Sequence, residues 1–475
     1  MSIVVEDNKD ATITNDFYIN NVIAFTINNI SVPLANSIRR TILSDIPSVS
    51  FDDTWIDNEN TISIHIVKNN SGLHNEFLSH RLSLIPINRY NVETRNRLQI
   101  ETIFNTTTNK RDFSFNSETD IPTFKLHIHN SSEASIKKNN YGLVEVNSNH
   151  IQYGDFMGDI DVSSYFQPDL YIKETENDDE YIILNMLKDN EELEIYMKPT
   201  IGLGKYNARY CTVGTVSYKF NIDEEKVETT FNQIIQKANE ERIEKKLNVF
   251  NKEEIEAKKK SFMLLDKERV YKSDIYKKPN SFHYCVESIG ALPSHQIVYD
   301  SLIMIRLRLN DIVQAFTGFI KNDTTTIYAN KDSVTHNKVN VYQSIDNLLG
   351  YTIVIQNNNH TMGNLINHYI NMLFTNSYMD IEDVTAIPNF ESIDLNEVDL
   401  YTYNQSILEH CGYKMPHPLH AEIEFKLKLS SKLGEFKIFE LYEEYSLELN
   451  QMYNIQIGDV GLISDQETQK IIVIY

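Results

Sequence analysis

The sequence predicts an α+β fold built from two related strand–helix units, and three patterns carry this prediction. Residues 422–429 (EIEFKLKL) alternate polar and apolar side chains, which is typical of a half-buried strand. Residues 292–316, with Ser294 as the expected N-cap, place apolar side chains at steps of four and three, the spacing of a helix that packs against another helix. Residues 25–42 (FTINNISVPLANSIRRTI) and 353–370 (IVIQNNNHTMGNLINHYI) align without a gap and indicate an internal repeat.

Length and composition indicate a globular protein of more than one domain. The chain has 475 residues, 41% of them hydrophobic, with 27 Tyr and 22 Phe, which is enough to bury two or three cores. The net charge of −23 opposes binding to a polyanion, so we expect protein partners and no direct sequence-specific nucleic-acid binding. No apolar run reaches the roughly 18 residues of a spanning helix, so we expect no membrane span. The first residues lack the pattern of a signal peptide, and the three cysteines form no CxxC pair. We therefore expect an intracellular location.

Each copy of the repeat is predicted to contain a strand, a polar turn and a helix. Asn29 and Asn357 match in the turn, and a small residue, Ala35 or Gly363, stands at the helix start, where a close backbone approach is expected. Each helix has one apolar face without a partner of its own, so two copies related by a pseudo-two-fold axis would bury these faces against each other. The predicted internal interface consists of Leu34, Ala35, Ile38, Ile42, Met362, Gly363, Leu365, Ile366 and Ile370.

Several segments are predicted to be insertions or connectors. Residues 223–280 contain the mixed-sign run QKANEERIEKKLNVFNKEEIEAKKKSF, which is typical of an exposed helix. Residues 321–344 are polar and aperiodic, which predicts a linker, and residues 376–406 are predicted to be an acidic insertion. The final residues, 451–475, are predicted to form a C-terminal extension that ends in an apolar, strand-like run.

Six motifs resemble one protein family in the order in which the family carries them. Residues 34–48 (LANSIRRTILSDIPS) resemble the dimerisation motif of the bacterial RNA polymerase α subunit, its archaeal D-type counterpart and the third-largest subunit of eukaryotic polymerase II. Residues 360–370 and 412–429 resemble the smaller partner, which is the archaeal L-type protein or the eleventh subunit of polymerase II. The later motifs of the larger partner have similar counterparts in this chain at residues 73–87 (LHNEFLSHRLSLIPI), 202–220 and 282–302.

The resemblance implies that both halves of an α-type dimerisation platform are fused in one chain. The implied organisation is a first unit at 15–50 and 212–320, which contains the charged insertion, a mainly β inserted domain at 51–211, and a second unit at 345–450. Such fusion is known from polymerases of large DNA viruses, so a viral origin is expected, with the protein in the virion and the host cytoplasm.

The implied function is that of a non-catalytic scaffold. The paired halves would nucleate polymerase assembly by docking the largest and second-largest subunits, with small N-type and P-type subunits nearby. The chain would then have no catalytic residue, cofactor or metal of its own, although the complex is a nucleotidyltransferase. The side chains implied to dock the large subunits, where positive charge suits carboxylates at an interface, are Arg39, Arg40, Arg81, Lys205 and Arg209.

Two other functions stay open from the sequence. A zinc-dependent hydrolase could be built on His410, Cys411, His417 and His420, although prolines interrupt this set and its spacing fits no fixed zinc motif. The other alternative is a protein interaction module unrelated to transcription, which would not co-purify with large polymerase subunits.

Overall fold

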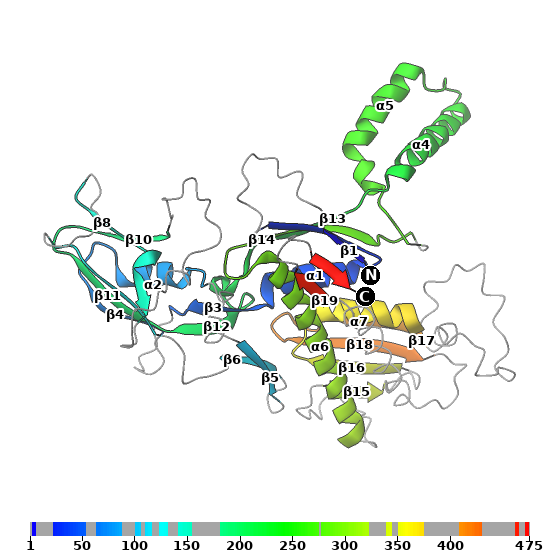
Figure 1. Cartoon of the computed structure of the whole chain (residues 1–475). Coiled ribbons are helices and arrows are strands. Elements are labelled where there is room, and N and C mark those ends of the chain that lie inside the picture. Colours follow the sequence, from blue (N-terminus) through cyan, green and yellow to red (C-terminus); the bar gives the residue numbers. More distant parts are fainter. Residues whose placement is uncertain are drawn as a thin grey trace.

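Two antiparallel sheets enclose a layer of helices at the centre of the molecule (Figure 1). A β-rich part extends to one side of this centre, and a pair of helices projects from another. The computed structural model describes residues 2–5, 22–53, 63–87, 100–105, 110–115, 123–131, 141–153, 181–274, 277–322, 339–343, 350–374, 408–429, 461–464 and 471–474. The predicted acidic insertion 376–406 lies outside these residues.

The first sheet and its two helices are formed by two separate stretches of the chain, within residues 2–44 and 213–322. Its strands, in spatial order, are β1 (Ser2–Val5), β2 (Val22–Asn28), β14 (Ser281–Ser288) and β13 (Val213–Phe220). Helix α1 (Val32–Ser44) follows β2; the Ser31 side chain accepts a hydrogen bond from the Leu34 N–H at its start. Helix α6 (Ser294–Asn322) follows β14; Ser294 is its first residue and not its N-cap, because the Pro293 carbonyl already accepts the Ile297 N–H.

The second sheet has the same strand order along its own stretch of chain. Its strands, in spatial order, are β15 (Val339–Gln343), β16 (Gly350–Gln356), β18 (Glu422–Leu429) and β17 (Leu408–Lys414), all antiparallel. Helix α7 (His360–Phe374) follows β16, as α1 follows β2. Strand β15 lies inside the predicted linker 321–344: Val339 and Val341, two residues apart, are both buried in the core, which makes this segment part of the sheet.

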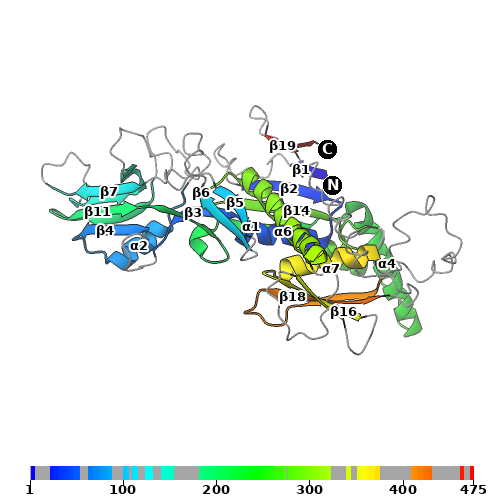
Figure 2. The same ribbon diagram turned by 90° about the horizontal axis from the view of Figure 1, so that it is seen from below.

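The helices of the central layer lie between the two sheets, as Figure 2 also shows from below. Helix α1 packs against both α6 and α7, and α7 packs on β17 and β18. One hydrophobic core joins both sheets and all three helices, and it includes Phe25, Ile38, Ile305, Ile366 and Phe425. The two halves are therefore not separate cores connected by a tether.

The β-rich part has a second core of its own. Strands β3 (Pro47–Phe51) and β12 (Pro199–Leu203) pair with each other where the chain leaves the centre and returns. The other elements are β4 (Ile64–Asn69), α2 (Asn75–Ser83), β5 (Ile100–Asn105), β6 (Lys110–Phe115), β7 (Phe124–His129), β8 (Val144–Asn147), β9 (Ile151–Tyr153), β10 (Ile183–Leu187) and β11 (Glu192–Met197), with four-stranded order β4-β11-β7-β9.

The charged insertion 223–280 forms two helices where the sequence pattern predicted one. Helix α4 (Glu224–Glu244) ends before Lys246, whose φ of 56° is left-handed, and α5 (Lys252–Leu265) begins with a capping box between Asn251 and Glu254. The mixed-sign pattern continues through the break, so helical spacing alone did not reveal it.

The chain ends with a two-stranded sheet, β19 (Gly461–Ser464) and β20 (Ile471–Ile474), and β20 contacts β1. Strand β1 begins before the predicted start of the first unit at residue 15. Within the residues that the structure describes, no helix is both long and apolar enough to cross a membrane.

Candidate functional site

The candidate site is the seam where α1 meets α7. Every residue of the predicted internal interface is buried: Ile38 and Met362 have 0% of their surface exposed, and Ile370, at 7%, has the most among the apolar side chains. The eight side chains larger than glycine all belong to the core that both sheets share. Burial of this kind stabilises by about 1.5–3 kcal/mol for each large apolar side chain, so the seam is a major source of stability.

Polar contacts also cross the seam. The Ser37 hydroxyl on α1 lies 3.4 Å from the carbonyl oxygen of Thr361 on α7 and 2.7 Å from that of Pro33, one turn earlier on α1. Behind α1, the Tyr284 hydroxyl donates to the Ala35 carbonyl oxygen at 2.8 Å. Burial raises the pKa of Tyr284 well above its ordinary value, so this hydroxyl stays a donor at any physiological pH.

The two small residues at the helix starts, Ala35 and Gly363, leave room for aromatic side chains. A Cβ added to Gly363 would lie 2.6 Å from the Tyr413 ring of β17, too close for any real contact. The expected close approach of two backbones is therefore wrong here; the space is filled by an aromatic ring. Ala35, fully buried, instead lies beneath Tyr284 of β14, whose ring stacks on Phe25 with centroids 5.1 Å apart.

Sequence reasoning missed an ion pair between α1 and α6 and a hydrogen bond that links it to the start of α7. Asp45, the C-cap of α1, has a side chain that is only 5% exposed, and Arg308 of α6 donates to it at 2.7 Å. The same guanidinium lies 3.5 Å from the Oδ1 of Asn359, which accepts the Thr361 N–H at the start of α7. Lys205 approaches Asp45 at 3.8 Å from the loop after β12. We call Asp45, Arg308 and Asn359 the three-helix clamp.

The five predicted docking side chains have different surroundings. Arg40 is exposed on α1, whereas Arg39 is partly buried and donates to Asn36 one turn before it at 2.9 Å. Arg81 is exposed on α2 and donates to the Ile183 carbonyl oxygen at 2.5 Å. Lys205 is 40% exposed beside the three-helix clamp.

Arg209 is committed inside the chain. Its side chain is 6% exposed and binds Asp52 at 2.8 Å and also Asp53, so its charge is neutralised by two carboxylates of the same chain. The guanidinium ties the turn after β12 to the end of β3. Arg209 therefore makes internal ion pairs, and the docking role expected for it stays a prediction.

The four residues of the zinc alternative do not form a ligand shell. Cys411 points from β17 toward α7, where its Sγ lies 3.4 Å from Asn367 Oδ1, and burial raises the pKa of its thiol to about 12. A zinc ligand must be a thiolate, which this burial opposes. His417 and His420 lie in the exposed turn between β17 and β18, with ring centroids 5.0 Å apart. In the described residues no three His, Cys, Asp or Glu side chains gather as a metal requires.

Fold and seam together define an α+β protein organised around a seam between helices of two antiparallel sheet units. The family model for the RNA polymerase Rpb3/Rpb11 dimerisation domain matches residues 24–306 of the chain. That match covers more than half of the 475 residues, and the chain belongs to this family.

Curated relatives include RNA polymerase subunits. The human DNA-directed RNA polymerases I and III subunit RPAC1 is 26% identical over 204 residues, which is 42% of this chain and 51% of the relative. The Arabidopsis thaliana DNA-directed RNA polymerases II, IV and V subunit 3 is 22% identical over 309 residues, 61% of this chain and 86% of the relative. The RPB3 subunit of polymerase II from Schizosaccharomyces pombe is 36% identical over 73 residues, 15% of this chain and 21% of the relative. The chain thus spans about half the length of the human relative.

Proposed function

We propose that the chain is a non-catalytic assembly subunit of a DNA-directed RNA polymerase, with a third-subunit-like half and an eleventh-subunit-like half fused in one polypeptide. One observation carries the proposal: α1 and α7, each following a strand of its own antiparallel sheet, pack against each other within a single chain. The family is named for dimerisation between two such partners, and its match ends at residue 306, before β15 begins. In this proposal the chain itself supplies the second partner of the seam.

We propose further that the two halves are related by a pseudo-two-fold axis. Three local features support this relation: the shared strand order, the turn and the strand register. Asn29 and Asn357, which lie in the turns between strand and helix, have φ values of 59° and 58°. Phe25 pairs with Tyr284 on the neighbouring strand, as Ile353 pairs with Phe425.

Fusion changes the physics of assembly. Two separate subunits must find each other from solution and lose translational freedom, whereas tethered halves meet at an effective concentration on the order of millimolar. Pairing of the halves then becomes a folding step, and the large subunits receive a preformed docking surface. The chain contributes no chemistry in this proposal; its contribution is preorganisation.

Docking of the largest and second-largest subunits falls, in this proposal, to the accessible cations Arg40, Arg81 and Lys205, with Arg39 partly accessible on the same helix as Arg40. Small N-type and P-type subunits would pack nearby. A large DNA virus as the source, with the protein in the virion and the host cytoplasm, is also part of the proposal; the fused architecture supports it.

Affinity purification of the tagged full chain from its native source, followed by mass spectrometry, tests the assembly role. We expect both large polymerase subunits at one copy per copy of the chain. Recovery without any large polymerase subunit would replace the proposal with that of an unrelated interaction module.

A charge reversal, Arg40→Glu, tests the docking role of α1. We expect lower recovery of a large subunit, because a repelled carboxylate at an interface costs affinity. The matched control is Lys237→Glu, which changes another exposed cation, on the projecting α4. Equal recovery with both variants would remove Arg40 from the docking surface.

A further inference from the structure

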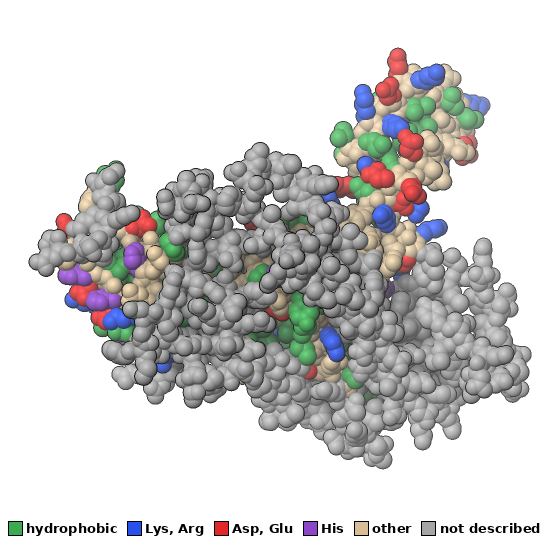
Figure 3. Space-filling model, in the orientation of Figure 1, with side chains coloured by type: hydrophobic (Ala, Val, Ile, Leu, Met, Phe, Trp, Pro, Cys, Tyr) green, Lys and Arg blue, Asp and Glu red, His purple; other side chains and the backbone are tan. Residues whose placement is uncertain are grey.

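The helical hairpin α4–α5 stands away from the body of the molecule, as the space-filling view shows (Figure 3). Its own core contains three buried side chains, Val227, Phe231 and Phe262, and lies apart from the two larger cores. The hairpin therefore adds little to the stability of the central layer. A projection of this length needs another explanation.

The hairpin is held firmly at its base and along its length. Ile222 and Tyr271 form an isolated β-bridge where the two helices leave the first sheet, and the Asp223 N–H donates to the Val270 carbonyl oxygen at 2.9 Å. Along the helices, Lys259 pairs with Glu228 at 2.7 Å. The surface of the hairpin is thus presented in a defined orientation, which lowers the entropy cost of binding a partner.

The C-terminal half of α5 exposes apolar side chains. Leu264 and Leu265 are 84% and 72% exposed and Met263 is 38% exposed, and we call these three the α5 patch. Phe262, the adjacent residue, faces α4. Because successive helical residues are rotated by about 100°, Leu264 points away from α4 and cannot belong to the hairpin core. Of the seventeen large apolar side chains that are exposed in the described residues, seven lie on this hairpin.

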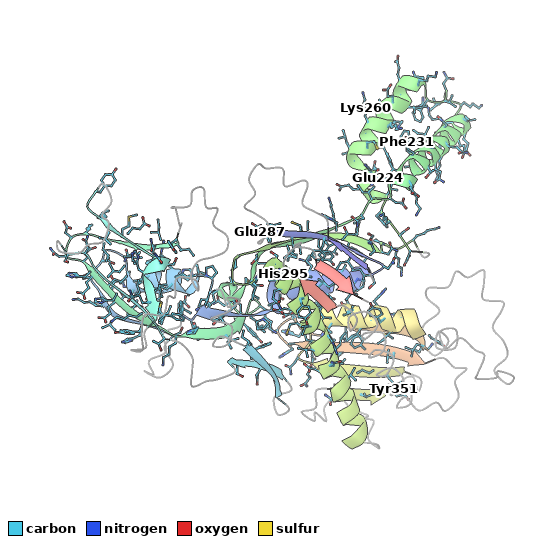
Figure 4. All side chains as sticks on the ribbon, viewed as in Figure 1. Glu224, Phe231, Lys260, Glu287, His295 and Tyr351 are labelled. Carbon is cyan, nitrogen blue, oxygen red and sulfur yellow. The ribbon has the colours of Figure 1, made fainter. Side chains whose placement is uncertain are left out.

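Positive charge surrounds the α5 patch. Residues 257–270 contain five Lys or Arg and two acidic residues, in a chain whose net charge is −23. Lys259 and Lys267 are paired with glutamates of α4, and Arg269 is paired with Asp266. Lys260 lies one turn before Leu264, on the side of α5 away from α4 (Figure 4). Its ammonium group has no ion-pair partner in the described part of the chain.

We propose that the α5 patch docks an acidic, amphipathic helical segment of a partner protein. Leucines of the segment would cover Leu264 and Leu265, and one of its carboxylates would meet Lys260. Nucleic acid fits less well, since the leucine pair offers a phosphate backbone nothing and Glu253 and Glu256 occupy the N-terminal half of α5. The proposal is independent of the assembly role in transcription.

Fluorescence anisotropy with the purified full chain tests the proposal. The probe is a labelled helical peptide that repeats leucine at every third or fourth position with glutamate between. We expect saturable binding that weakens about tenfold or more in the double variant Leu264→Glu, Leu265→Glu, because buried apolar contacts carry most of the binding energy at such an interface. Lys260→Glu should weaken binding less, and the loss should shrink as salt is raised.

Two controls make the result specific. Asn232→Glu changes an exposed position on α4 and should leave the affinity unchanged. A peptide with lysine in place of glutamate should bind at least about tenfold more weakly than the acidic probe. Equal binding to the double variant, equal binding of the lysine peptide, or binding of a single-stranded RNA in preference to the acidic peptide would each overturn the proposal. Circular dichroism confirms that the variants keep their helices.

Discussion

The α1 unit and the α7 unit share a strand order and a turn, yet they differ in what fills the space beside the helix. In the first unit the fully buried Tyr284 donates a hydrogen bond to the Ala35 carbonyl oxygen. In the second, the Tyr413 ring comes from a different strand of the sheet and occupies the space that a Cβ of Gly363 would need. The two helices of the seam therefore follow their strands in the same way but pack against differently placed tyrosines.

This difference shows which features the seam requires. Both units use an apolar helix face and a left-handed asparagine before the helix, so these two features are the shared requirement. The aromatic partner and the small residue vary, because packing asks only that the volume beside the helix be filled. Within the described residues, the three-helix clamp has no counterpart in the second unit, because Arg308 lies on α6 of the first unit.

The strongest challenge to the seam is a charge inside it. Ile38→Asp and Ile366→Asp each bury a carboxylate among apolar side chains, and we expect each to lower the free energy of unfolding by about 4 kcal/mol or more. Urea denaturation measures the loss, and size-exclusion chromatography reveals any uncoupling of the halves. Asn364→Asp, at an exposed position of α7, is the control. A soluble, fully stable double variant would mean that the seam does not hold the halves together.

Breaking the three-helix clamp should have the next largest effect. Arg308→Met leaves the Asp45 carboxylate buried without its main partner, and we expect a loss of about 3 kcal/mol. Arg306→Met changes an exposed arginine two residues earlier on α6 and should change stability by less than about 0.5 kcal/mol. Both values come from urea denaturation. Similar losses from the two variants would show that the clamp contributes nothing specific.

Substitutions at Gly363 and Ala35 distinguish the two packing arrangements beside the helices. Gly363→Ala should cost about 1–3 kcal/mol, because its methyl group overlaps the Tyr413 ring. Combining it with Tyr413→Leu should recover part of that loss. Ala35→Gly should cost about 1 kcal/mol, from the added freedom of the unfolded chain. Thermal and urea unfolding measure these differences; a harmless Gly363→Ala would show that the ring moves aside.

The turns should respond equally, since their conformation is shared. Asn29→Ala and Asn357→Ala each place a Cβ-bearing residue without a local hydrogen-bonding side chain at a left-handed φ, which costs about 1 kcal/mol. Glycine at either position should change the free energy of unfolding by only a few tenths of a kcal/mol, because it adopts a positive φ without strain. Unequal losses, measured under identical denaturation conditions, would weaken the proposed pseudo-symmetry.

The smallest expected effect is a pH dependence from α7. Burial, with a smaller contribution from Lys278, lowers the pKa of His368 from 6.5 to about 4. The unfolded chain then binds a proton at higher pH than the native chain, so stability is lost as the pH falls from the unfolded value toward the native one. We expect His368 to account for a loss of roughly 1 kcal/mol between about pH 7 and pH 5. A His368→Gln variant whose stability falls just as steeply over this interval would exclude the histidine as the cause.

Sequence periodicity correctly predicted the helices and the strand around the seam. The apolar steps along α1, α6 and α7 and the alternation in β18 predicted the elements and their buried faces, because periodic burial is a local property of the chain. The break at Lys246 escaped prediction, since neither glycine nor proline marks it. The predicted domain bounds stay a prediction.

The sequence by itself determined the two strand–helix segments, their apolar helix faces and the family to which the chain belongs, since each depends on short stretches of residues. Only the tertiary structure decided which charged side chains are exposed to solvent and which form ion pairs within the chain. Arg209 and Arg308 are indistinguishable from surface arginines in the sequence, and the partner of Arg308 lies 263 residues away. Such pairings depend on distances in space, and a linear pattern does not encode them.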